Sequence, residues 1–199
     1  MTDIAILILA AGASSRMRGR DKLAERVAGE PLLRLQVRRA MATGHPVFVA
    51  LPSADHPRVG FLAGLQTTPL FIPNAAEGMG VTLRDAVAQL PSCDALLVCL
   101  ADLVALETAD IAAVIAARKR APDALVWRGA TEAGKPGHPI LFDASLRAQF
   151  AALSGDAGGA AILRPLTEQT CLVPLPGDRA LLDLDTPEDW AAWRERGAK

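Results

Sequence analysis

The chain has 199 residues, 51% of them hydrophobic, and a net charge of -1 from 21 basic and 22 acidic residues. Its length fits one domain over residues 1–199, and the hydrophobic content excludes a disordered chain. The balanced charge argues against bulk attraction to nucleic acid or to an anionic membrane, so any anion binding must be local.

The first apolar run, Ile4–Ala11, is too short for a membrane helix, which needs about 20 residues. No Lys or Arg precedes the run, and Asp3 stands where a signal peptide carries positive charge. We therefore expect a buried strand and a cytoplasmic protein. The three cysteines, Cys93, Cys99 and Cys171, lack metal-site spacing and are expected to be free residues of the core or strands.

Strand-like runs alternate with helical periods along the rest of the chain. The predicted strands are Ile4–Ala10, Val47–Leu51, Leu70–Pro73, Ala95–Ala101, Ala124–Trp127, Ile140–Phe142, Leu172–Leu175 and Leu181–Leu184. The predicted helices are Leu32–Thr43, Val59–Gln66, Val81–Leu90, Ala109–Arg120, Ala144–Leu153, Ala160–Leu166 and Pro187–Arg196. This alternation predicts a single-domain, Rossmann-like three-layer α/β/α sandwich with a mostly parallel sheet. The stretch 129–159 departs from it and should form loops and a short antiparallel piece over the carboxyl edge.

Two elements carry further signals. The run Ala95–Ala101 has no polar interruption, so both of its faces should be covered. The last helix has Thr186 as its expected N-cap, Pro187 at its first position, and an acid three residues after the cap. Trp190 and Trp193 should pack this helix onto the body.

The loop after the first strand reads Leu9-Ala-Ala-Gly-Ala-Ser-Ser-Arg-Met-Arg-Gly-Arg-Asp-Lys-Leu23, with a local charge of +3. It lacks the G-x-G-x-x-G dinucleotide fingerprint, and Leu23 follows Lys22 where a P-loop needs Ser or Thr. Gly12 allows close approach of a ligand, the serines can donate hydrogen bonds, and Arg16 and Lys22 supply charge. The loop is either a polyphosphate receptor or a solvated basic loop.

Carboxylates lie at two positions where they could hold a cation beside a bound polyphosphate. Asp102 directly follows the apolar run Ala95–Ala101, at the strand end where open α/β sheets bind ligands. It is either a magnesium ligand or the start of a turn. In Asp183-Leu184-Asp185 alternation places both acids on one face, and Asp185 is either a second metal contact or a complement to the following helix dipole.

The motif Leu-Ala-Ala-Gly-x-Ser-Ser-Arg-Met, followed by Asp-Lys-Leu, resembles the signature of the molybdenum cofactor cytidylyltransferases, within the wider superfamily of MobA-like nucleotidyltransferases. The resemblance implies the nucleotide-diphospho-sugar transferase type of fold. It assigns catalysis to Arg16, Lys22 and Asp102, and makes Asp102 the main magnesium ligand with Asp185 as helper. It implies that the nucleotide is bound by Leu9, Ala10, Ala11, Gly12, Ala13, Ser14, Ser15, Arg16 and Lys22.

The resemblance extends from Leu7 to Asp189 in five ordered blocks. Nucleotide contacts beside the base and ribose are implied for Asn74, Gly78 and Thr82. Contacts to the acceptor are implied for Lys135, Pro136, Gly137 and His138 of a Gly-x-Pro-Gly-His-Pro motif, and for Gly155 and Asp156. The chain departs from the family at Arg18, where Gly is usual, and at Val104, where Pro is usual.

The resemblance implies magnesium-dependent transfer of CMP from CTP to the terminal phosphate of molybdopterin or the molybdenum cofactor, with release of pyrophosphate. Ala11 and the Pro-Gly-His-Pro segment favour cytidylyl over guanylyl transfer. A molybdoenzyme or an insertion chaperone would be a further partner. The alternatives are guanylyl transfer, transfer to a sugar or polyol phosphate, and a non-catalytic cofactor-binding partner of a molybdoenzyme.

Overall fold

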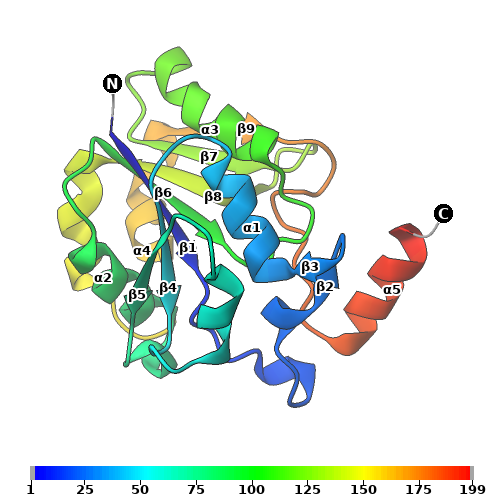
Figure 1. The fold of residues 1–199 in the computed structure, drawn as a ribbon. Helices are drawn as coiled ribbons and strands as arrows, with labels where there is room; N and C mark the ends of the chain where they lie inside the picture. Colours follow the sequence, from blue (N-terminus) through cyan, green and yellow to red (C-terminus); the bar gives the residue numbers. More distant parts are fainter. Residues whose placement is uncertain (1–2, 198–199) are drawn as a thin grey trace.

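The computed structural model describes residues 3–197 and contains a seven-stranded sheet between two helical layers (Figure 1). The strand order is β5-β4-β1-β6-β8-β7-β9, and only β8 runs antiparallel to its neighbours among these seven strands. The strands are β1 (Ile4–Leu9), β4 (Val47–Leu51), β5 (Thr68–Phe71), β6 (Ala95–Leu100), β7 (Val126–Ala130), β8 (Pro136–Asp143) and β9 (Thr170–Pro174). The predicted α/β sandwich with a mostly parallel sheet is confirmed.

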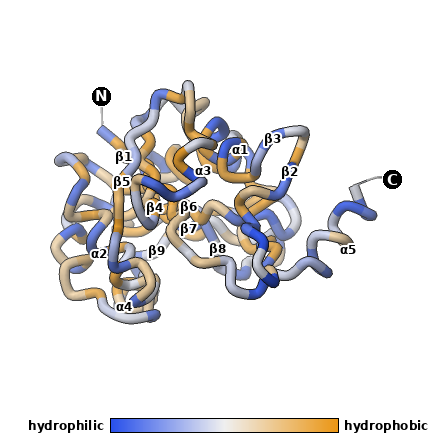
Figure 2. Tube along the Cα trace, turned by 60° about the horizontal axis from the view of Figure 1, so that its bottom comes forward, coloured by the Kyte–Doolittle hydropathy of each residue, from blue (hydrophilic) through white to orange (hydrophobic). Residues whose placement is uncertain are grey.

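Helices α1 (Leu32–Met41) and α3 (Thr108–Arg120) pack on one face of the sheet, and α2 (Met79–Gln89) and α4 (Ala160–Leu163) pack on the other. The last helix, α5 (Pro187–Gly197), lies at the side of the molecule, beside β2 (Arg26–Val27) and β3 (Glu30–Pro31) (Figure 1). Shorter 3₁₀ segments lie at Ser15–Met17, Lys22–Ala24, Pro57–Leu62, Ala75–Glu77, Ala144–Ala152 and Arg164–Gln169. In β1, Ile4, Ile6 and Ile8 belong to one apolar core, and Ala5 and Leu7 belong to the other. In Figure 2 the hydrophobic colour is concentrated in the strands and helices of the layers, whereas α5 is mostly hydrophilic.

The central strand β6 is buried on both faces, as its uninterrupted apolar sequence predicts. Residues 95–99 of β6 are all buried, with alternate side chains in the two cores, so both faces of this strand are covered. Burial raises the pKa of the Cys99 thiol to about 12, as expected of a core cysteine, and all three cysteines are free. Among residues 3–197, no helix has the length and apolarity that crossing a membrane requires.

Several predicted elements differ in extent or type. The antiparallel piece is eight residues long and lies inside the sheet between β6 and β7, not over its edge. The predicted helices Val59–Gln66 and Ala144–Leu153 are 3₁₀ segments, and Gly64 at φ +76° cannot continue a right-handed helix. The prediction Ala160–Leu166 is too long, because Pro165 lacks an N–H and the α-helix ends at Leu163.

The predicted strand Leu181–Leu184 is wrong. Turns replace it, because the amides of Leu181 and Leu182 both bond back to the carbonyl of Asp178. Leu184 is still buried. The apolar residue that suggested a strand therefore packs in the core without pairing in a β-sheet. Only an isolated antiparallel bridge joins Asp183 to Leu103.

A small hairpin, β2 (Arg26–Val27) and β3 (Glu30–Pro31), was not expected. Its two-residue turn, Ala28-Gly29, has positive φ at both positions, a weak signal without Asn or Asp. By contrast, the start of α5 matches its prediction. The Thr186 amide donates to Asp189 Oδ2 at 2.9 Å and the Asp189 amide donates to Thr186 Oγ1 at 3.2 Å, while Trp190 is buried against Trp193.

Candidate active site

Three segments meet where β1 and β6 end. The loop 10–22 follows β1, Asp102 comes just after β6, and residues 183–185 lead into α5. The Ala101 amide donates to the Leu9 carbonyl at 3.2 Å, and the Leu103–Asp183 bridge holds the third segment beside the second. This edge is where open α/β sheets bind ligands.

Lys22 lies between two of the acids. Its Nζ is 2.5 Å from Asp102 Oδ2 and 2.7 Å from Asp185 Oδ1. Arg16 reaches Asp185 from the other side, with Nη2 at 2.7 Å from Oδ2. Burial by itself would lower the pKa of Lys22, but Asp102 and Asp185 outweigh it and raise the pKa above its ordinary value. Lys22 is therefore charged. The basic residues expected to bind phosphate lie in direct contact with the acids expected to bind a metal ion.

A third acid completes the carboxylate group. Oxygens of Asp102, Asp183 and Asp185 lie within 4.8 Å of one another. Burial, followed by the charges of Asp185 and Asp102, raises the pKa of Asp183. Asp102 Oδ1 is buried and has no hydrogen-bond partner. Three converging carboxylates and an unpartnered oxygen suit a hard divalent cation. Asp183 was not predicted as a ligand, although the Asp-x-Asp spacing was its signal.

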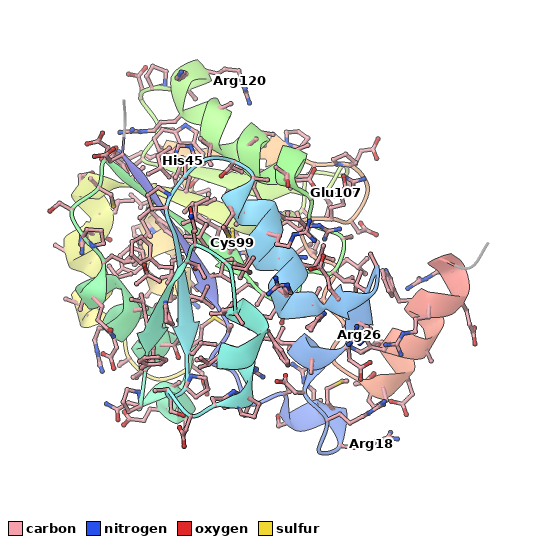
Figure 3. The ribbon with its side chains drawn as sticks, in the orientation of Figure 1. Arg18, Arg26, His45, Cys99, Glu107 and Arg120 are labelled. Carbon is pink, nitrogen blue, oxygen red and sulfur yellow. The ribbon has the colours of Figure 1, made fainter. Side chains whose placement is uncertain are left out.

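The cationic loop is held in a specific shape. Ser14 and Arg18 both adopt the left-handed conformation, with φ of 52°. The Gly that the family resemblance implies at position 18 would adopt this positive φ without strain. Arg18 lies at the outer end of the loop (Figure 3), and its side chain pairs with Glu188 of α5 at 2.8 Å. The other departure, Val104, is buried, and its carbonyl accepts from Arg39 at 3.0 Å.

Arg58, in the 3₁₀ segment after β4, also contacts this loop. Its guanidinium donates to Asp21 through two nitrogens, to Ser14 Oγ and to the Ala10 carbonyl. Sequence reasoning did not identify it, because a single Arg 36 residues after Lys22 carries no motif.

Two glycine-rich blocks, assigned separately to nucleotide and acceptor, lie in contact. The Gly80 amide donates to the Gly155 carbonyl at 2.7 Å, and a Cβ at Gly78 would lie 2.5 Å from the same oxygen. Glycine is therefore required here for close approach. Thr82 is buried with its hydroxyl bonded to the Gly78 carbonyl at 3.1 Å, and Asn74 is exposed. The start of α2 is thus fixed by the Gly155 turn.

A cavity of about 400 Å³ lies beside this contact, between α2, α4 and the strands β6, β7 and β8. Its apolar walls are formed by Leu9, Met79, Leu83, Val98, Ile140, Phe142, Phe150, Ala157, Ala160 and Leu163, together with Gly158 and Gly159. Its polar lining residues are Arg128, His138, Asp156, Arg164 and Thr167.

His138 is the most constrained polar group of the cavity. Burial lowers its pKa to about 4, the Val98 backbone partly opposes this, and its Nδ1 is buried without a partner. The ring is therefore neutral near pH 7 and can accept or donate a hydrogen bond to a ligand. Arg128 Nε donates to the Gly137 carbonyl at 2.8 Å, which fixes the Arg128 side chain beside it.

The residues assigned to the acceptor divide into two groups. His138 and Asp156 line the cavity. Lys135 and Pro136 are exposed near the β7–β8 turn, and Gly137 is packed against Ala180. Arg128 and Arg164 line the cavity but were not predicted, because neither belongs to one of the recognised blocks.

The family model for the MobA-like NTP transferase domain matches residues 6–193. The chain belongs to this family. No curated protein sequence matches it. The family match includes the cationic loop, all three acids and every lining residue of the cavity.

Solved structures of low identity share the fold of this MobA-like chain. Rv0371c from Mycobacterium tuberculosis H37Rv superposes with a TM-score of 0.81 at 22% identity, over 98% of both chains. The same protein in a complex with manganese gives 0.79 at 21% identity, again over 98% of both. A CMP:2-keto-3-deoxy-manno-octonic acid synthetase complexed with CTP gives 0.76 at 15% identity, over 99% of both.

Proposed function

We propose that the chain transfers CMP from CTP to the terminal phosphate of molybdopterin or the molybdenum cofactor, releases pyrophosphate and uses magnesium. The observation that carries this is the contact of Lys22 with both Asp102 and Asp185. It unites a cationic loop fit for a triphosphate with oxygen ligands fit for a divalent cation. The CTP complex and the manganese complex among its structural relatives support the nucleotide and the metal.

The reaction needs charge neutralisation more than proton transfer. A phosphate oxygen of the acceptor attacks the α-phosphorus in line, so a new O–P bond forms while the bond to pyrophosphate breaks. Pyrophosphate leaves with the bonding electron pair. Because the nucleophile is already an anion, no strong general base is required. Arg16 and Lys22 stabilise the negative charge that develops on the phosphates.

Asp102, Asp183 and Asp185 would hold the metal, which supplies positive charge to the phosphate oxygens when bound. In the structure Lys22 pairs with Asp102 and Asp185, and Arg16 pairs with Asp185. With Asp102 and Asp185 occupied as metal ligands, Lys22 and Arg16 would be free to contact the triphosphate. The loop and the acids would therefore exchange partners when the nucleotide and its metal enter together.

The cavity supports an acceptor with an apolar body and an anionic group. Phe142, Phe150 and Ile140 offer flat or aliphatic walls, while Arg128 and Arg164 offer positive charge. A ring system that carries a phosphate, as in molybdopterin, fits this combination. The structural relative that acts on a sugar acid with CTP favours a second candidate, transfer to another acidic or phosphorylated acceptor.

A pyrophosphate assay separates these functions. Purified protein is incubated with each of the four NTPs, magnesium or manganese, and molybdopterin cofactor or a sugar phosphate. Release with CTP and the cofactor alone, together with a cytosine dinucleotide product, supports the proposal. Release only with the sugar phosphate supports the second candidate, and release with GTP indicates guanylyl transfer. Tight cofactor binding without any release would identify a non-catalytic partner of a molybdoenzyme or its insertion chaperone.

A further inference from the structure

Arg58 is buried beneath the cationic loop, with only 2% of its side chain exposed. Its Nε lies 2.8 Å from Asp21 Oδ2 and its Nη2 lies 2.7 Å from Asp21 Oδ1, a bidentate pair. Nη2 also lies 3.2 Å from Ser14 Oγ, and Nη1 lies 2.5 Å from the Ala10 carbonyl. One side chain therefore contacts the start, the middle and the end of loop 10–22.

These contacts lead directly to Lys22. Asp21 precedes it and accepts from the Leu23 amide at 3.0 Å, which begins the 3₁₀ turn that carries Lys22. Ser14 Oγ accepts from the Lys22 amide at 3.4 Å and donates to Asp21 Oδ1 at 3.2 Å. Burial acts to raise the pKa of Asp21, but Arg58 outweighs it and the pKa is lowered. The carboxylate stays ionised, so the pair persists at neutral pH.

The loop's arginines make further ion pairs, such as Arg16 with Asp185 and Arg18 with Glu188, but both arginine side chains are largely exposed, so these pairs stabilise the loop's shape little. Gly12, Ala13, Ser15 and Arg16 are exposed, and between Gly12 and Lys22 the apolar core receives Met17 alone. Two residues adopt the left-handed conformation, which costs about 1–2 kcal/mol for a residue with a Cβ unless the surroundings impose it.

We propose that Arg58 is a positioning residue, which holds the loop in the shape that receives a triphosphate and aims Lys22 at the carboxylates. This rests on the proposed nucleotidyl transfer. Arg58 is enclosed by the loop, so it acts through Asp21 and Ser14 and not on the substrate.

The chain offers a matched control in Arg34 of α1. Its Nη1 donates to the carbonyls of Phe61 and Ala63, both at 2.9 Å. Arg34 therefore holds the same 3₁₀ region that carries Arg58, and its hydrogen bonds and ion pair go to Phe61, Ala63 and Glu30 and not to loop 10–22. A purely structural role for Arg58 predicts similar behaviour in Arg34→Met and Arg58→Met.

The experiment compares wild type, Arg58→Met, Arg58→Lys and Arg34→Met by limited trypsin digestion, because Arg16, Arg18, Arg20 and Lys22 are cleavage sites within the loop. For Arg58→Met we expect loop cleavage about tenfold faster, CTP KM about tenfold higher and kcat about 10²-fold lower, since small misplacements of reacting groups have such effects. Arg58→Lys keeps the positive charge but cannot form the bidentate contact with Asp21. Its loop cleavage, KM and kcat should therefore lie between those of wild type and Arg58→Met. Arg34→Met should match wild type in loop cleavage and kcat.

Equal loop cleavage and equal kinetics in Arg58→Met and Arg34→Met would overturn the proposal. If circular dichroism shows that Arg58→Met does not fold, the test uses Arg58→Lys instead. Wild-type loop cleavage and kinetics in Arg58→Lys would then overturn the proposal. If wild type releases no pyrophosphate with any nucleotide and acceptor, the proposed transfer fails. Loop cleavage then still decides whether Arg58 orders the loop.

Discussion

At the ends of β1 and β6, Lys22 contacts Asp102 and Asp185 directly, whereas the walls of the neighbouring cavity are mostly phenyl, aliphatic and glycine surfaces. In the proposed reaction, the charged centre neutralises phosphates, which every nucleoside triphosphate shares. The cavity would recognise one acceptor by its shape and a few polar contacts. Substitutions at the centre should therefore reduce turnover with every acceptor, and substitutions in the cavity should change the affinity for one.

The largest effect is expected from Asp102→Asn. This change keeps the shape but removes a charge from the three-acid group, so manganese binding should weaken more than tenfold and turnover should fall about 10³-fold. Manganese electron paramagnetic resonance and pyrophosphate release measure the two effects. Asp123→Asn, on an exposed turn far along the chain, serves as the control. A normal metal titration in Asp102→Asn would remove Asp102 from the metal site.

Lys22→Ala distinguishes the role of the lysine charge from that of the bound metal. Turnover should fall about 10²- to 10³-fold because a fixed charge on the phosphates is lost. Manganese binding should be retained or tightened, because a cation that competes for Asp102 and Asp185 is gone. The exposed Lys119→Ala on α3 is the matched control. Unchanged turnover in Lys22→Ala would contradict its role.

The buried His138 of the cavity should make the free energy of unfolding depend on pH in the acid range. His138 has a pKa of about 4 in the folded chain, against about 6.5 when unfolded, so the unfolded state binds the proton first as the pH falls. Its contribution is complete above pH 6.5 and is lost between pH 6.5 and about 4, by about 1–3 kcal/mol in the free energy of unfolding. Asp21, Asp143 and Asp189, with lowered pKa values, act only below about pH 4. Urea unfolding at several pH values should show a flatter dependence in His138→Gln, and an identical slope would contradict the buried neutral ring.

Arg128→Met tests whether the cavity binds the acceptor. The KM for the acceptor should rise about tenfold, as for one lost charge-assisted hydrogen bond, while the KM for CTP stays the same. Arg120→Met, at the far end of α3 (Figure 3), is the control for removal of an arginine. A rise in the KM for CTP alone would instead place the nucleotide in the cavity.

The smallest effect is expected from Arg18→Gly. The substitution removes the strain of a left-handed Arg but also the exposed pair with Glu188, which is worth little in water. The free energy of unfolding should rise by up to about 1 kcal/mol, as measured by thermal or urea unfolding, with turnover unchanged. A large loss of turnover would show that Arg18 contacts the phosphates.

The sequence predicted β1, β4 and β6 closely because their apolar runs are local signals, whereas the predicted edge strands begin two residues after the starts of β5 and β9. It placed Lys22 in a loop and Asp102 at a strand end, and both positions are confirmed. It could not predict the 2.5 Å contact between them, which spans 80 residues. The prediction of a strand at Leu181–Leu184 was wrong because the apolar residues there, the partly buried Leu182 and the buried Leu184, pack against the core without a strand partner.

By itself, the sequence determined the α/β class, the family, the cationic loop and the acids that face it, because periodicity and short motifs are properties of neighbouring residues. The tertiary structure decided that Asp183 joins the acids, that Arg58 holds the loop, that Arg18 pairs with Glu188 and that Arg128 lines a cavity. Each of these depends on the crossing of distant segments. Side-chain contacts across a sheet depend on the path of the whole chain, so no local pattern specifies them.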